Sequence, residues 1–245
     1  MTLDFLTPSG TGGGVAAASP LEPWLREAGA SFETREGWLV ATSFGSPDAE
    51  LEALHTAAGI ADRSAMGKLE LQGTPDAVGS LLASVMPGGP PDPGETADLD
   101  GAFAWLSSPD RAMAVCEPAE TRSVMDLLES VCRISPHCGV VDLTAGLAAI
   151  ELRGPHARSV LERLTAIDVR ESRLPVGGVR AGAVAEVAAT LLRIDQDGFL
   201  ILVGAQEAPD AWEIVLDAGG PLGARPVGAD ALAKREPRGE AMAHA

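Results

Sequence analysis

Two aspartates lie at the end of a long loop, a place where catalytic and binding groups are common. Residues 86–98 hold four prolines and three glycines, with acidic residues between them, and cannot form regular structure. Asp98 and Asp100 follow where this loop enters a strand, shortly before Trp105. Loops anchored on rigid strands often carry function, so these two carboxylates are candidates for a functional site. The alternative is an exposed pair of acids on a solvated surface.

Two other aspartates share a local pattern. Asp62 and Asp142 are each followed two residues later by a hydroxyl, at Ser64 and Thr144. They could act as acid or base groups, or each could accept a backbone N–H bond in a turn at the entrance of a strand. Because the pattern occurs twice, we favour the turn. Asp195 and Asp197, just before Gly198, lack the further oxygen ligands of a cation loop and predict a tight hairpin turn.

The cysteines and histidines do not predict a metal centre. Cys132, His137 and Cys138 are close in sequence, but adjacent His and Cys side chains rarely converge on one tetrahedral ion, and no fourth ligand is apparent. Three cysteines without framework spacing indicate reduced thiols and a cytoplasmic location. No serine lies in a Gly-x-Ser-x-Gly motif, so an ordinary serine hydrolase finds no support.

The elements that would position these residues alternate between helices and strands. Thr74 is expected to cap a helix that begins at Pro75, because a hydroxyl side chain at the N-cap and proline at the first position favour a helix start. Gly59 is expected to end the preceding helix. Apolar periodicity predicts helices at 23–28, 48–58, 155–164, 209–218 and from 118 or 121 to 131. It predicts strands at 68–72, 102–106, 112–115, 148–152, 184–188, 190–193 and 199–203.

One segment recurs after about 80 residues. The order Gly, Asp, hydroxyl, strand, Gly, Pro and helix runs from Gly59 to Ala77 and again from Gly139 to Ala157. The repeat favours a duplicated αβ unit. The core must be built from Ala, Val, Leu and Ile, because only 4% of residues are aromatic and there is no Tyr, and this composition also favours an α+β fold.

Charge and hydropathy exclude two classes of partner. The formal charge is −17, and the only lysines are Lys68 and Lys234, so a nucleic-acid partner is not expected. No apolar run of 18 residues is present, and we therefore expect no membrane span. Residues 1–20 lack the basic start and apolar centre of a secretion signal, and they predict a flexible arm.

From about residue 22 to about residue 230, the sequence resembles the glycine-cleavage T-protein (aminomethyltransferase) family. The resemblance rests on the stretch from Gly59 to Leu69, which contains Ser-x-Met-Gly-Lys, on Gly154-Pro155-x-Ala157 and on Asp197-Gly198-Phe199, with Trp38 and Trp212. The short chain and the brief hairpin at 194–199 resemble the gamma subunit of heterotetrameric sarcosine oxidase more than a full aminomethyltransferase.

This resemblance implies an α+β fold of two related αβ (ferredoxin-like) units without the family's C-terminal barrel domain. We expect a first unit at 21–135 and a second at 136–235, flanked by the arm at 1–20 and a flexible tail at 236–245. The family also implies tetrahydrofolate as a possible cofactor.

Site residues implied by the resemblance are few. Asp100 falls near the family's acidic pair and would be the catalytic group, Met66 would touch the pterin, and Arg193 and Asp197 match polar positions beside the Gly-Phe turn. No metal ligand is implied. The family's folate-holding Glu falls at Leu200, whose side chain cannot pair with a pterin, and the family's Tyr contacts are absent.

Two functions remain open at this point. The chain could be an accessory subunit with a degenerate folate site, packed against a larger one-carbon or amine-oxidising enzyme. It could instead be a free-standing enzyme, alone or as a homo-oligomer, that uses the T-protein cavity for tetrahydrofolate or other small-molecule chemistry, with Asp100 as its acid–base group.

Overall fold

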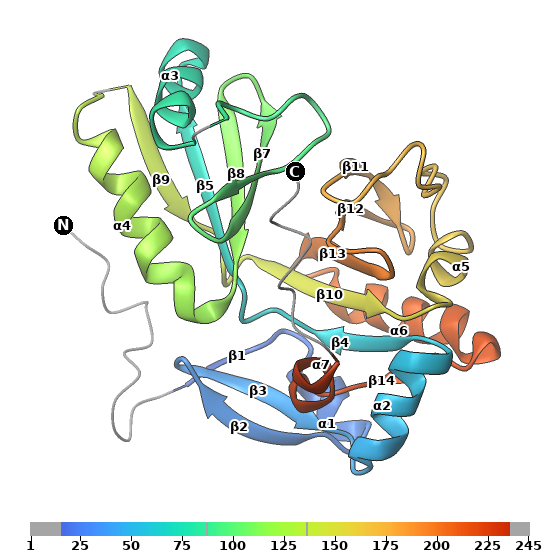
Figure 1. The fold of residues 1–245 in the computed structure, drawn as a ribbon. Coiled ribbons are helices and arrows are strands. Elements are labelled where there is room, and N and C mark those ends of the chain that lie inside the picture. Colours follow the sequence, from blue (N-terminus) through green and yellow to red (C-terminus); the bar gives the residue numbers. More distant parts are fainter. Residues whose placement is uncertain (1–15, 87, 136, 236–245) are drawn as a thin grey trace.

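The computed structural model describes residues 16–86, 88–135 and 137–235, which form three β-sheets with helices on their faces (Figure 1). The N-terminal arm expected over residues 1–20 lies largely outside the described residues, and so does the tail expected over residues 236–245. Within the described part of that arm, Ala17 and Ala18 pair in parallel with Trp38 and Leu39 as a short strand.

The smallest sheet lies beside the C-terminal helix. It contains β1 (Ala17–Ala18), β2 (Ser31–Arg35) and β3 (Trp38–Ser43) in the order β1-β3-β2, and its helices are α1 (Glu22–Glu27), α2 (Pro47–Thr56) and α7 (Ala229–Lys234). The carboxylate of Glu50 joins these pieces, because it accepts bonds from Ser43 Oγ (2.8 Å), Phe44 N (2.7 Å) and Gly228 N (2.7 Å). This buried clasp fixes the C-terminal helix against β3.

The six-stranded sheet carries the largest core. Its strands are β4 (Gly59–Asp62), β10 (Leu147–Arg153), β11 (Val179–Val184), β12 (Val187–Arg193), β13 (Gly198–Gly204) and β14 (Arg225–Pro226), in the order β11-β12-β13-β10-β4-β14. On one face, Ile150 and Leu152 pack with Trp212 of α6 (Ala208–Gly219) and Leu161 of α5 (Ala157–Leu161). A 3-10 turn, η3 (Gly220–Leu222), follows α6.

The five-stranded sheet is covered on one side by two helices (Figure 1). Its strands are β5 (Gly67–Gly73), β6 (Ala97–Leu99), β7 (Ala102–Ser108), β8 (Arg111–Cys116) and β9 (Cys138–Asp142), in the order β6-β7-β8-β5-β9. The helices are α3 (Pro75–Val85) and α4 (Thr121–Cys132), with a 3-10 turn, η2 (Pro118–Glu120), before α4. Thr74 Oγ1 accepts from Ala77 N (3.4 Å), so the predicted cap is confirmed.

The repeated Asp-x-hydroxyl segments link neighbouring strands within each of the two larger sheets. Asp62 and Asp142 each accept the backbone N–H two residues on, at 2.9 and 2.8 Å, which confirms the turn interpretation. Each hydroxyl then accepts a hydrogen bond from the other repeated segment: Thr144 Oγ1 accepts from Lys68 N (3.1 Å), and Ser64 Oγ accepts from Ala149 N (3.3 Å). Each sheet also takes a strand from across residue 135, since β4 pairs with β10 and β9 pairs with β5. The boundary expected at that residue stays a prediction.

Three local predictions are wrong. The sequence predicts a strand at 184–188, but Ala185 and Glu186 have φ of 51° and 66° and form the turn of the β11–β12 hairpin. The turn contains no glycine and is flanked by valines, so the sequence carries no turn signal there. Gly59 begins β4, and its helix ends earlier, at Thr56. The loop at 86–98 ends in regular structure, because Ala97 opens β6.

Candidate functional site

Met66 lies in an apolar cluster that joins the two larger sheets. It is only 2% exposed and packs with Trp105 and Met113 of the five-stranded sheet and Leu192 and Leu200 of the six-stranded sheet. These side chains come from the face of each sheet opposite its main core, because strand residues alternate between faces. The position that the resemblance assigns to a pterin contact is thus part of a packed core.

Leu200 is fully buried in the same cluster. It pairs with Glu151 of β10 on one side and with Leu192 of β12 on the other. The leucine side chain offers neither donor nor acceptor, so at the position that the resemblance matches to the family's Glu it cannot pair with a pterin.

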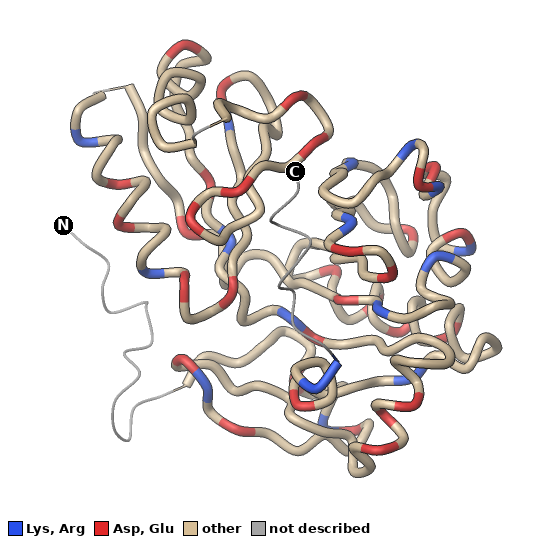
Figure 2. Tube along the Cα trace, viewed as in Figure 1, with Lys and Arg blue, Asp and Glu red and all other residues tan. Residues whose placement is uncertain are grey.

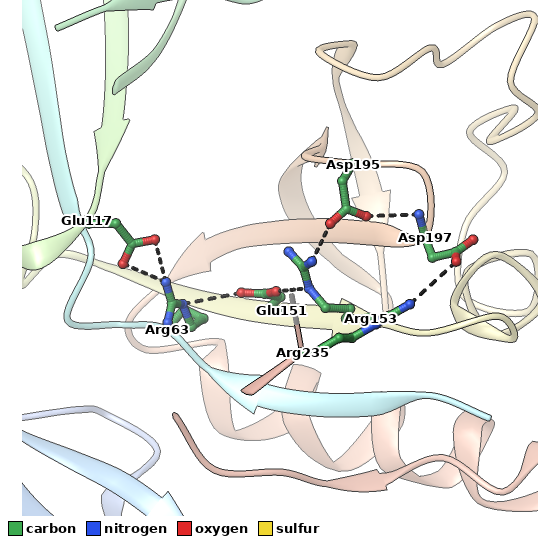
Figure 3. A network of polar contacts seen from close by, with 7 residues as sticks. All are labelled: Arg63, Glu117, Glu151, Arg153, Asp195, Asp197 and Arg235. Carbon is green, nitrogen blue, oxygen red and sulfur yellow. Dashed lines mark hydrogen bonds and ion pairs between the residues drawn. The ribbon is translucent and has the colours of Figure 1, made fainter. Parts of the chain in front are cut away.

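A strip of alternating charges continues from this cluster along β10 (Figure 3). Arg63 Nη2 lies 2.7 Å from both carboxylate oxygens of Glu117, and Arg63 Nε lies 3.3 Å from Glu151 Oε2. Arg153 Nε donates to Glu151 Oε1 (2.6 Å), and Arg153 Nη1 donates to Asp195. The strip runs from Glu117, the residue after β8, through β10 to the β12–β13 hairpin. Opposite charges alternate along it and neutralise one another.

The side chain of Arg193 is buried and binds backbone carbonyls. Its guanidinium donates to the carbonyls of Leu174 (3.1 Å), Gln196 (2.8 Å) and Asp195 (3.3 Å). Burial lowers the pKa of Arg193, and the neighbouring Arg158 lowers it further. With its donors directed at carbonyls, the side chain supports the β12–β13 hairpin.

Asp197 lies on the same hairpin and points away from Arg153 (Figure 3). Its carboxylate lies 3.5 Å from Arg235, and its backbone N–H donates to Asp195 Oδ1 (2.9 Å). The tight turn expected at 195–198 is therefore present. Asp197 and Arg193 are neighbours, but they do not meet Met66.

Asp100 occupies the exposed turn between β6 and β7, with φ of 50°. Burial raises the pKa of Glu120, and the nearby charges of Asp100 and Asp98 raise it further. Within the described residues, Asp100 has no hydrogen bond or ion pair to Met66, Arg193 or Asp197. The four residues implied by the resemblance thus fall into three separate environments.

An open cavity of about 420 Å³ lies beside the apolar cluster, between the loop before β6 and the turn before β11. Its rim carries the exposed carboxylates Glu95 and Asp98, and Phe103 and Ile194 line its apolar wall. Two hydrogen bonds join the loop before β6 to the turn before β11, since Thr96 N and Thr96 Oγ1 both donate to the carbonyl of Gly177 at 2.8 Å. Sequence reasoning missed the cavity because this contact joins residues that are 81 apart in the chain.

Lys68 is a buried cation whose pKa is shifted, and the sequence analysis did not predict this. It is 0% exposed, and Nζ donates to the carbonyl of Ser64 (2.8 Å). Burial lowers its pKa to about 8, opposed by the charges of Asp62, Asp142 and Cys116. The signal in the sequence was a lysine in an otherwise half-buried strand.

The described residues contain neither a cluster of metal-ligating side chains nor a long apolar helix. Within residues 16–86, 88–135 and 137–235, no group of three or more His, Cys, Asp or Glu side chains could hold a metal ion. In the same part of the chain, no helix is long and apolar enough to cross a membrane. Acidic residues are spread over all three sheets and their helices, with basic residues among them (Figure 2).

Comparisons with known proteins give the family. The family model described as "GCVT N-terminal domain" matches residues 99–239, more than half of the chain. The chain is 27% identical over 228 residues to the aminomethyltransferase of Shouchella clausii, and 28% identical over 223 residues to that of Saccharopolyspora erythraea. Each alignment covers 86% of this chain and 60% of the relative, so the chain spans less than two thirds of these proteins.

Two solved structures share the fold. The glycine cleavage system aminomethyltransferase T from Bartonella henselae has a TM-score of 0.72 at 20% identity, covering 88% of this chain and 60% of that one. A chain of heterotetrameric sarcosine oxidase from Corynebacterium sp. U-96 has a TM-score of 0.63 at 21% identity, covering 85% of this chain and 97% of that one. The chain therefore belongs to the GCVT N-terminal domain family and is an aminomethyltransferase-like protein with the T-protein fold.

Proposed function

We propose that this chain is an accessory subunit, with a degenerate folate site, of a larger enzyme of tetrahydrofolate-linked one-carbon or amine metabolism. The observation that carries the proposal is the full burial of Leu200 beside Met66 and Trp105. A pterin placed there would lose water from its polar ring edge and gain no partner from Leu200. Each unpaired buried polar group costs about 1–3 kcal/mol.

The charged strip supports the same proposal. Arg63, Glu151 and Arg153 form ion pairs with one another and with neighbours at both ends, so these side chains already neutralise one another without a ligand. A ligand that recruited Glu151 would have to break pairs of a carboxylate that is only 2% exposed, and breaking a buried pair by removing one partner costs about 3–5 kcal/mol.

A known subunit with the same fold also supports the proposal. The sarcosine oxidase chain that shares the fold is covered over 97% of its length and comes from a heterotetrameric enzyme. We also propose that the chain divides into two related ferredoxin-like units near residue 135. The larger partner would lie in the cytoplasm, where the three unpaired cysteines would normally stay reduced.

Calorimetric titration with tetrahydrofolate tests the degenerate site. We expect no binding at millimolar ligand, with an authentic aminomethyltransferase as the positive control. Binding at micromolar concentration would refute the degenerate site. For the accessory role, the tagged full chain should co-purify from its source in fixed stoichiometry with a larger enzyme, whereas a partner-free chain that turns over substrate would contradict it.

The cavity favours a second candidate, a free-standing enzyme that reuses the T-protein fold. Glu95 and Asp98 could accept from an ammonium group while Phe103 packs against its apolar part. In this function Asp100, close in sequence to the rim, would be the acid–base group. An Asp100→Asn variant that keeps full turnover would remove that role.

A further inference from the structure

Two of the three cysteines lie at the two ends of one turn. Cys132 is the last residue of α4, and Cys138 is the first residue of β9. Two backbone hydrogen bonds fold the chain back between them: Ser135 N donates to the carbonyl of Cys132 (3.1 Å), and Cys138 N donates to the carbonyl of Ser135 (3.3 Å). Both cysteines pack against the core between the five-stranded sheet and its helices.

The side chains of this pair pack against the same apolar cluster from the two ends of the turn. Burial raises the pKa of the Cys132 thiol to about 11, and the charge of the Cys138 thiolate is the next cause. Cys138 Sγ also lies against the backbone of Gly73, 3.0 Å from where a Cβ would stand. The third cysteine differs, because Cys116 is 1% exposed and its thiol is directed at Thr121 Oγ1 (3.8 Å).

Solvent reaches Cys138 through a groove. An open groove of about 470 Å³ runs along β9 and the adjoining ends of β5 and β8, and its wall includes Cys138, His137, Gln72 and Arg111. Both Cys132 and Cys138 are half-buried, so a small disulfide in solution could reach them. The proposed function needs neither residue for ligand binding or catalysis.

We propose that Cys132 and Cys138 form a reversible intramolecular disulfide on exposure to small disulfides such as glutathione disulfide. The Cys138 thiolate attacks one sulfur of glutathione disulfide, forming a mixed disulfide and releasing one glutathione thiolate. The Cys132 thiolate then attacks the Cys138 sulfur, closes the protein disulfide and releases the second glutathione. The two protons lost by the protein thiols end on the two glutathiones, and the two electrons reduce glutathione disulfide.

The order of attack follows from the environment. Cys138 lies in the wall of the groove, where a small disulfide meets it first, whereas Cys132 does not line the groove and acts as the resolving thiol. The raised pKa of the Cys132 thiol supports this order. The product would tie the end of α4 to β9, an edge strand of its sheet, and would do so at the wall of the groove.

The test treats the native full chain with glutathione disulfide, then unfolds it and counts free thiols. We expect the count to fall from three to one, the mass to fall by two hydrogens, and a single proteolytic fragment to carry the Cys132–Cys138 link. Three thiols remaining, a persistent glutathione adduct, or a link between two chains would each overturn the proposal.

Single variants check the pairing and the order. Cys116→Ser should still lose two thiols, because Cys116 takes no part. Cys132→Ser should stop at a glutathione adduct on Cys138, and Cys138→Ser should form an adduct at least tenfold more slowly. A Cys132→Ser chain that closes an internal disulfide as fast as the wild type would show that the pairing is wrong.

Discussion

Replacing Lys68 with methionine should remove a pH dependence from the stability of the protein. Lys68 has a pKa of about 8 in the folded chain, against an ordinary value of 10.5, mainly because it is buried. Between these values the unfolded chain binds more protons than the folded chain, so stability rises with pH in this window. Methionine at this position has a similar length and no charge.

The size of the effect follows from the two pKa values. From pH 7 to pH 9, the contribution of Lys68 to the free energy of unfolding should increase by about 1.3 kcal/mol. Two thiols oppose the trend above pH 9, because burial raises the pKa of Cys116 and of Cys132 from 9.0 to about 11. Their contributions largely cancel when the wild type is compared with Lys68→Met.

Urea unfolding at pH 7, 8 and 9 measures the effect, since both chains expose similar surface and the slopes should agree. The free energy of unfolding of the wild type minus that of Lys68→Met should rise with pH. Lys234→Met serves as the matched control, because Lys234 is exposed near the end of α7 and should show no such trend. A difference that is constant or falls with pH would refute the account of Lys68 as a desolvated cation.

Three further substitutions test other parts of the structure. Glu50→Ala should lower the free energy of unfolding by about 3 kcal/mol, because three donors lose their buried acceptor, whereas the exposed Glu52→Ala should change it by less than about 0.5 kcal/mol. Arg193→Lys should lower the free energy of unfolding by about 2 kcal/mol in urea, since an ammonium cannot span three carbonyls. Arg122→Lys on the surface should be near neutral, and equal effects of the two substitutions would contradict the bracing role of Arg193. Leu200→Glu should destabilise the chain at pH 7 and less at pH 4, where the buried carboxyl is protonated, as thermal unfolding at the two pH values would show.

The sequence predicts the fold better than the site, for physical reasons. Thr74 and Asp142 act through contacts within three residues, so their roles follow from local rules. The burial of Met66 and the partners of Arg193 depend on how two sheets pack, and no local pattern encodes that packing. The hairpin turn at Ala185 escaped notice because its residues carry no turn signal and tertiary pairing imposes a positive φ.

The exchange of strands between the two repeats, which the hydrogen bonds of Ser64 and Thr144 reinforce, limits where the chain can be divided into fragments. Each repeated segment gives its first strand to the other sheet, as in a swapped dimer whose two subunits have been fused into one polypeptide. Neither half then contains all the strands of its own sheet. A fragment ending near residue 135 would expose the edge of β5 where β9 belongs and would be prone to associate through it. We therefore expect that both repeats are needed for either sheet to form all of its strand pairs.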